Sequence, residues 1–158
     1  MAKITILGID PGTNRIGHAV LKKDKNGVKA INYGCWEFSL PKKDYRLVQL
    51  SRNLKGIINQ YKPDYLALEG IYFFKNAKTV MAVSEARGVI LLAAAQTKIP
   101  VIELAPLEIK QKISGYGRTE KKDMQKKIQK LLKLKTLPQP DDTADALAIA
   151  LAGLLKIR

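Results

Sequence analysis

The stretch that decides the fold is ITILGID, residues 4–10. It places Ile4, Ile6, Leu7 and Ile9 in a short run rich in β-branched residues, with apolar side chains at both alternating positions. Such a run is typical of a central strand that is buried on both faces. Asp10 ends the run, and the following Pro-Gly pair turns the chain. A sheet with this strand near its centre is therefore predicted.

The rest of the chain completes the prediction of an α/β protein. A second strand is expected over residues 18–22, and Asn26-Gly27 is a strong hairpin signal before a third strand over 28–38. Further strands at 65–69 and 101–104 alternate with expected helices at 44–61, 78–97, after Pro106, 119–134 and 142–157. Three hairpin-style strands followed by this alternation predict a mixed sheet with helices on both faces. Without repeats or linkers, residues 1–158 are predicted to form a single domain.

Composition indicates the partner more than the fold. The chain has 28 Lys and Arg residues against 14 acidic ones, a net charge of +14, which favours nucleic acid over an anionic membrane surface. Cys35 is the only cysteine, so an internal disulfide is excluded, and His18 is the only histidine, which argues against a histidine-ligated metal and a Ser-His-Asp triad. Both residues are interpreted as structural. The N-terminus lacks the features of a signal peptide, and the apolar stretch at 89–95 is far too short to span a bilayer, so a cytoplasmic protein is expected.

Scarce acidic residues stand at informative places. Asp10 and Glu69 each end an otherwise apolar strand, at the edge of an α/β sheet where ligand sites gather. Asp142 and Asp145 open the last helix three residues apart and share one face. Four carboxylates brought together need cations to stay ionised, and hard oxygen ligands suit Mg²⁺ or Mn²⁺. Two such ions can activate water and stabilise the leaving oxygen of a phosphodiester.

Plainer interpretations exist for several of these acids. Asp10 before Pro-Gly is also a common turn former, and Asp141 or Asp142 is a favoured helix N-cap. Glu69 is harder to explain in this way, because an acid directly after Leu-Ala-Leu is poorly placed for a solvated surface. Jointly, the four acids favour a metal site.

Residues 110–135 form the most basic segment, with ten Lys or Arg residues against two acids. Met124, Ile128, Leu131 and Leu132 make an apolar stripe, which leaves the lysines on the solvated face. Phosphate contact explains such a one-sign face better than solubility does. The expected DNA-binding cations include Lys110, Arg118, Lys121 and Lys122.

Two apolar features lie outside this segment. Tyr72 and Phe73 belong to an aromatic run directly after Glu69, which is either part of the core or a loop that stacks on opened bases. The helix expected over 78–97 is apolar nearly all round. One stripe should pack on the sheet, and another either lies deep in the core or forms a two-fold dimer interface.

Taken in order, several segments resemble the RuvC-type Holliday junction resolvases of the RNase H-like superfamily. They are ILGIDPGTNRIGHAVL, PDYLALEGIYFFKNAKT, SEARGV, PLEIKQKISGYGRTEKK and DDTADALAIALA, and they cover nearly the whole chain. The resemblance implies an RNase H-like fold and a homodimer that makes paired nicks in a four-way junction, with the RuvA–RuvB branch-migration complex as partner. It also implies that catalysis uses Mg²⁺, two ions per site with Mn²⁺ as a substitute.

Carried over residue by residue, the resemblance places the family's acids at Asp10, Glu69, Asp142 and Asp145. It places DNA contacts near the scissile phosphate at Lys110 and Lys121, and a junction wedge at Tyr72 and Phe73. Asp141, directly before the D-x-x-D motif, leaves a one-residue alternative for one ligand.

Three other functions are compatible with parts of the pattern. A YqgF-type RNase H-like nuclease that acts on RNA shares the opening strand, aspartate and turn. An actin- or sugar-kinase-like ATPase would use DPGTNRIG as a phosphate loop, but this chain is short for two lobes. A non-catalytic basic DNA-binding protein explains the charge and leaves Glu69 and the paired aspartates without a role.

Overall fold

The computed structural model describes residues 2–70 and 77–157. Within them the chain forms five strands and five helices. The strands are β1 (Ile4–Asp10), β2 (Arg15–Asp24), β3 (Gly27–Glu37), β4 (Tyr65–Glu69) and β5 (Val101–Leu104). The helices are α1 (Lys43–Tyr61), α2 (Ala77–Gln96), α3 (Pro106–Ser114), α4 (Lys121–Leu131) and α5 (Asp141–Lys156).

The strands form one mixed sheet in the order β3-β2-β1-β4-β5. β1 pairs antiparallel with β2 and parallel with β4, so the predicted central position of residues 4–10 is confirmed. β2 is longer than the predicted 18–22, because ladder bonds to β1 and β3 carry it through its polar ends. The predicted hairpin is confirmed, but its turn lies at residues 25–26, and Gly27, with a positive φ of 112°, is the first residue of β3 and pairs with Asp24.

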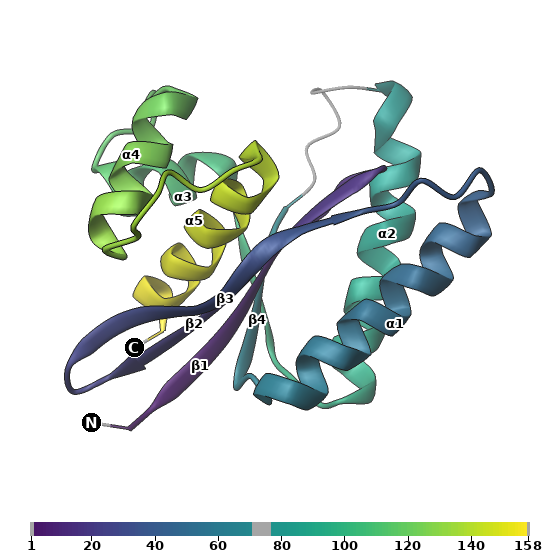
Figure 1. The fold of residues 1–158 in the computed structure, drawn as a ribbon, viewed down its shortest axis with the longest axis horizontal. Helices are drawn as coiled ribbons and strands as arrows, with labels where there is room; N and C mark the ends of the chain where they lie inside the picture. Colours follow the sequence, from purple (N-terminus) through teal and green to yellow (C-terminus); the bar gives the residue numbers. More distant parts are fainter. Residues whose placement is uncertain (1, 71–76, 158) are drawn as a thin grey trace.

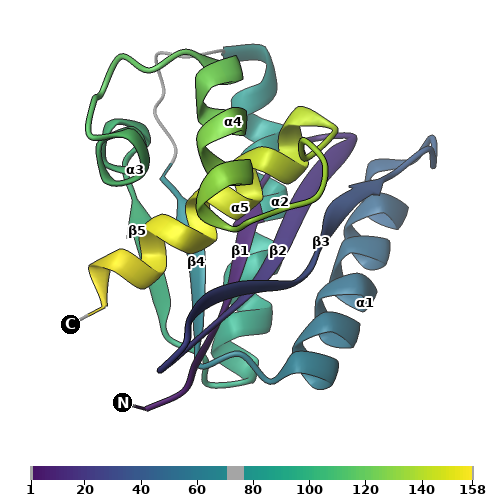
Figure 2. The ribbon, with the colours of Figure 1, turned by 60° about the vertical axis from the view of Figure 1, so that its left-hand side comes forward.

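Helices cover both faces of the sheet, as predicted. Figure 1 shows the sheet nearly edge-on, with α1 and α2 on one side and α3, α4 and α5 on the other. The first face buries Leu7, Ile9, Leu66 and Leu68 against α1 and α2. The second buries Ile6 and Ala67 against α5, which Figure 2 shows running across the sheet, with α4 packed beside it.

The ends of α4 differ from the predicted range of 119–134. The helix stops at Leu131, where Leu132 caps it and Lys133 adopts a positive φ of 52°. Ile128 and Leu132 are buried as expected, but Leu131 is 47% exposed, so its assignment to the apolar stripe was wrong. Within α4 the buried position next to this end is Ile128, and the chain buries Leu132 just after the helix.

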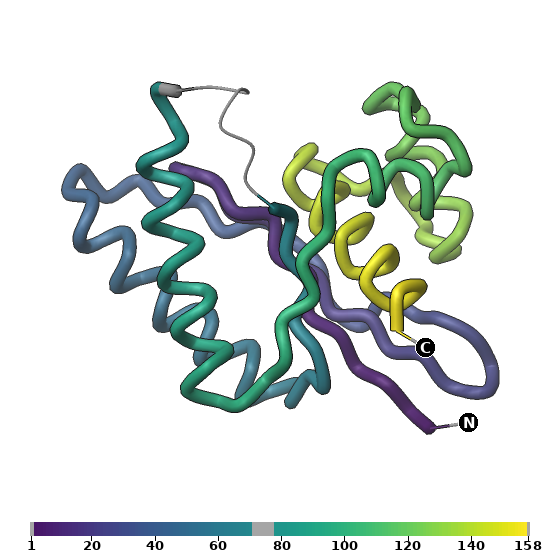
Figure 3. The backbone as a smooth tube through the Cα atoms, turned by 180° about the vertical axis from the view of Figure 1, so that it is seen from behind, coloured from purple at the N-terminus to yellow at the C-terminus, as the bar shows by residue number. Residues whose placement is uncertain are grey.

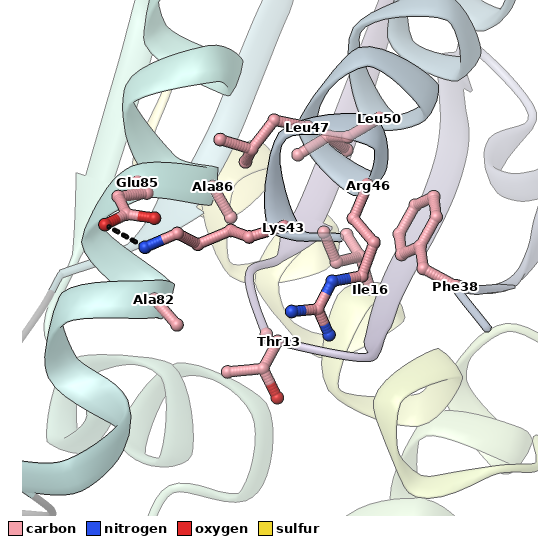
Figure 4. Close-up of a pocket in the computed structure, with 11 residues that line it drawn as sticks. Thr13, Ile16, Phe38, Lys43, Arg46, Leu47, Leu50, Ala82, Glu85 and Ala86 are labelled. Carbon is pink, nitrogen blue, oxygen red and sulfur yellow. Dashed lines mark hydrogen bonds and ion pairs between the residues drawn. The ribbon is translucent and has the colours of Figure 1, made fainter. Parts of the chain in front are cut away.

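Helix α2 packs on the sheet through one stripe, formed by Ala86, Ile90, Ala93 and Ala94. Seen from behind in Figure 3, it lies beside α1, and Lys43 Nζ of α1 lies 3.1 Å from Glu85 Oε1 of α2 at a small pocket (Figure 4). By length and composition alone, residues Lys78–Gln96 would also suffice to cross a membrane, a test that core helices of soluble proteins pass as well.

Candidate active site

Asp10 and Glu69 lie side by side at one edge of the sheet. β1 and β4 are parallel neighbours, and the register that pairs Ile9 with Leu68 brings the next residue of each strand to the same height. Side chains alternate along a strand, so Asp10 follows Ile6 and Gly8 onto the face of α5, and Glu69 follows Ala67. Both carboxylates are partly buried on this face.

Helix α5 brings the other two acids to the same edge. It begins at Asp141, above the carboxyl ends of β1 and β4, and its Ala- and Leu-rich sequence is buried along most of its length. Close packing depends on small residues beneath it, because a β-carbon on Gly8 would lie 2.6 Å from the Ala146 carbonyl oxygen. From the first turns of α5, Asp142 and Asp145 lie close enough to Asp10 for their charges to act on it.

The electrostatics of Asp10 show how closely the acids are gathered. Burial, together with the negative charges of Asp145, Glu69 and Asp142, raises the pKa of Asp10 to about 9, while Lys121 opposes the rise. For Asp145, burial together with Glu69 and Asp142 raises the pKa to about 6, against the lowering effect of Lys121. Without other cations the cluster therefore lowers its charge by holding protons.

The donor chemistry of this cluster fits a divalent cation. Carboxylate oxygens are the ligands that Mg²⁺ and Mn²⁺ prefer, and mutual repulsion among the acids is what a bound cation relieves. Among residues 2–70 and 77–157, no three His, Cys, Asp or Glu side chains are already arranged to hold a metal ion.

Asp141 has a different environment from Asp142. Its carboxylate accepts a hydrogen bond of 2.8 Å from Gln125 Nε2 and lies 3.4 Å from Lys121 Nζ, both on α4. Lys121 Nζ also lies 3.9 Å from Asp145. Pro140 occupies the N-cap position of α5 and the helix has no side-chain cap, so the N-cap interpretation of Asp141 or Asp142 was wrong.

Comparison with known proteins identifies this arrangement. Residues 6–153 match the family model described as crossover junction endodeoxyribonuclease RuvC. The chain is 45% identical to the RuvC of Syntrophomonas wolfei over 97% of its length and 90% of that protein. It is 49% identical to the RuvC of Petrotoga mobilis, with 93% and 91% covered. This chain belongs to the RuvC family.

Solved structures of a RuvC protein have the same fold. Thermus thermophilus RuvC in complex with Holliday junction substrate superposes with a TM-score of 0.87 at 27% identity, covering 94% of this chain and 92% of that one. A second structure of Thermus thermophilus RuvC gives a TM-score of 0.86 at the same identity and coverage. The predicted RNase H-like α/β fold is confirmed, and the family makes this chain an endodeoxyribonuclease that depends on divalent metal.

In this RuvC-family chain, most of the predicted DNA-binding cations surround the acidic edge. One depression between α3, α4 and α5 is lined by Glu69 and Asp145 together with Lys110, Arg118 and Lys121. Lys122 is exposed on α4 and is not among the residues that line this depression. Tyr72 and Phe73 lie outside the described residues, so their role as a wedge stays a prediction.

Two residues at this RuvC-family site were missed by the sequence analysis. Gln125 holds Asp141, and Arg87 of α2 donates a hydrogen bond of 2.9 Å to the Glu69 carbonyl oxygen. Gln125 has no distinguishing signal in the sequence. Arg87 has one, because it is a charge within an otherwise largely apolar helix, and buried Arg residues normally have a partner.

Proposed function

We propose that this RuvC-family chain cuts Holliday junctions by phosphodiester hydrolysis, with Asp10, Glu69, Asp142 and Asp145 as the catalytic and metal-binding residues. One observation carries the proposal. Two strands and one helix bring four carboxylates to a single sheet edge, and that edge adjoins a depression lined by Lys110, Arg118 and Lys121. Acids that bind metal beside cations that bind phosphate are the two components that such a nuclease needs.

The proposed cofactor is Mg²⁺, two ions per site, with Mn²⁺ as a substitute. When bound, these ions supply an activated water and stabilise the leaving oxygen. The four carboxylates would hold these ions, and the bound cations would offset the mutual repulsion that otherwise keeps protons on the acids. Lys121, whose pKa is raised by Asp145 and Asp141 against the lowering effect of burial, keeps its positive charge beside the scissile phosphate.

The proposed DNA surface extends from the depression onto α4. Lys110, Arg118 and Lys121 contact phosphates close to the cut, and Lys122 contacts the backbone farther along the helix. These contacts release counterions and fix the position of the DNA without reading sequence. Tyr72 and Phe73 are proposed to wedge between bases at the junction.

We further propose a homodimer formed through the outer face of α2. Met81 and Leu92 on this helix are large apolar side chains that are 70% and 57% exposed, and an interface over this face would remove both from water. A two-fold dimer would cover them and would supply two active sites for paired nicks. The proposal also includes a single nuclease domain over residues 1–158, a cytoplasmic location and the RuvA–RuvB complex as partner.

The test is cleavage of synthetic four-way DNA junctions, with and without Mg²⁺, with each strand labelled separately. We expect symmetric nicks in two opposed strands that require the metal. Asp10→Asn should abolish cutting and leave junction binding intact, because affinity comes from the cationic face. Linear duplex DNA and structured RNA serve as comparison substrates. Preferential cutting of RNA would support a YqgF-type activity instead, and metal-independent binding without cutting would support a DNA-binding protein.

A further inference from the structure

Arg87 connects three elements behind the acidic edge. From α2, its Nη1 donates a hydrogen bond of 2.9 Å to the carbonyl oxygen of Glu69, the last residue of β4. Its Nη2 lies 2.6 Å from Glu103 Oε1 on β5. A guanidinium group donates in a planar fork, so one side chain holds both acceptors at once.

The peptide unit between Glu69 and Gly70 is held from both of its ends. Its N–H, which belongs to Gly70, donates to the Leu104 carbonyl oxygen at 2.9 Å. Its carbonyl oxygen, which belongs to Glu69, accepts the bond from Arg87. This peptide unit lies at the point where β4 ends, and its orientation sets the direction in which the Glu69 side chain leaves the backbone.

Arg87 acts from the face of the sheet opposite to the acids. Glu69 points toward α5, whereas α2 packs on the other face with Leu66 and Leu68. The Arg87 side chain is only 13% exposed, so its charge is largely removed from water. Of its two acceptors, Glu103 is 56% exposed and reaches the solvent, so the Glu69 carbonyl oxygen is the one that Arg87 meets inside the fold.

We infer that Arg87 is a positioning residue for catalysis, which holds the end of β4 so that the Glu69 carboxylate faces Asp10 and α5. The inference rests on the proposed catalytic role of Glu69. Arg87 does not touch the acidic cluster itself, and it acts through the Glu69 backbone. Small displacements of a catalytic group reduce rates steeply, by roughly a hundredfold for about 1 Å.

The first test replaces the guanidinium and keeps a side chain of similar length, in Arg87→Met. We expect the single-turnover cleavage rate to fall roughly 10- to 100-fold, with the junction Kd within about twofold of wild type. The matched control is Glu85→Gln, which breaks another ion pair of the same helix, that with Lys43 (Figure 4), and should leave the rate unchanged. An unchanged rate in Arg87→Met overturns the inference.

The second test reads the peptide unit directly. Hydrogen exchange at the Gly70 amide should be faster in Arg87→Met than in wild type, while amides of β1 keep their protection. Equal exchange at Gly70 in the two proteins contradicts the inference whatever the cleavage rates. If Arg87→Met fails to fold, Arg87→Lys replaces it. An ammonium group satisfies one acceptor at a time, so we expect the Gly70 amide of Arg87→Lys to exchange at a rate between that of wild type and that of a protein without the Arg87 bond.

Two further variants separate the possible reasons for failure. Glu103→Gln leaves the bond from Arg87 to Glu69 in place and should lower the cleavage rate less than about threefold. If it matches Arg87→Met in rate, the ion pair with Glu103 is the whole role of Arg87, and the inference is wrong. If Glu69→Gln keeps wild-type cleavage, the proposed role of Glu69 fails first. Loss of cleavage in Glu69→Gln with normal cleavage in Arg87→Met rejects the positioning role alone.

Discussion

The backbone carbonyl oxygen of Asp142 lies so close to Gly17 that a β-carbon added there would clash with it. Gly17 is paired with Asp10 across the β1–β2 ladder. Gly17, which has no side chain, therefore lies beside Asp10 and directly beneath the turn of α5 that carries Asp142 and Asp145. The distance between α5 and the sheet at this edge depends on that missing side chain.

Gly17→Ala should separate the acids without removing any of them. The added methyl group must displace the first turn of α5 from β2, at a cost of about 1–3 kcal/mol for such overpacking. Cleavage should fall by orders of magnitude, while junction binding by the α4 lysines persists. The matched control is Gly56→Ala in α1, where a β-carbon meets no atom within 4 Å and should stabilise the helix by up to about 1 kcal/mol. Wild-type cleavage by Gly17→Ala would show that the acids tolerate this displacement.

Asp10→Asn should stabilise the metal-free protein at pH 8. The folded pKa of Asp10 is about 9 against an ordinary value of 3.8, so between these values the folded state holds a proton that the unfolded chain has released. The free energy of unfolding therefore falls as pH rises through this window. Thermal melts in chelator should place the variant at least about 2 °C above wild type at pH 8, with a smaller difference at pH 4. A lower Tm for the variant at pH 8 would contradict this.

Asp141→Asn and Asp142→Asn should differ sharply in cleavage. The amide side chain introduced by Asp141→Asn keeps an oxygen that accepts the bond from Gln125, so this variant should retain most activity. Asp142 is one of the charges that raise the pKa of Asp10, and its loss should lower cleavage by orders of magnitude. Steady-state rates at saturating Mg²⁺ measure both variants. Reversed activities would mean that the ligand register is shifted by one residue and that Asp141 binds the metal.

Lys121→Ala should weaken binding to branched DNA and reduce its salt dependence. Removing one phosphate contact lowers the slope of log Kd against log salt by about one unit. Titrations at several salt concentrations measure this slope. Lys55→Ala, which removes an exposed lysine from α1 on the other side of the sheet, should leave the slope unchanged. Equal slopes for wild type and Lys121→Ala would mean that Lys121 does not contact phosphate.

Leu92→Glu should convert the proposed dimer into monomers. A charge on the outer face of α2 is tolerated in water, since Leu92 is 57% exposed in the single chain, but it opposes burial at an interface. Light scattering at micromolar concentration should find a dimer for wild type and a monomer for the variant. Leu155→Glu, on a similarly exposed side chain of α5, should stay dimeric. A wild-type protein that is monomeric while it makes paired nicks would reject the α2 interface.

Much of the architecture followed from local patterns in the sequence. Apolar runs such as 4–10 and 65–69 were recognisable as strands because β-branched residues and sharp flanking turns restrict the backbone locally. Acids that end such runs were recognisable because a carboxylate after a buried strand has few structural explanations. The hairpin signal at Asn26-Gly27 was recognisable because glycine readily takes a positive φ, which Gly27 adopts next to the turn.

Only the tertiary structure decided which side chains support those acids. Arg87 meets Glu69 because α2 and β4 pack on each other, and Gln125 meets Asp141 because α4 lies beside α5. Contacts of this kind depend on how helices are placed over a sheet, and no periodicity within either segment encodes that placement. The sequence by itself determined the strands, the acids that end them and the basic charge. The packing of α5 on Gly8 and Gly17 determined that the four acids share one edge, because only side chains that small allow a helix to approach a sheet so closely.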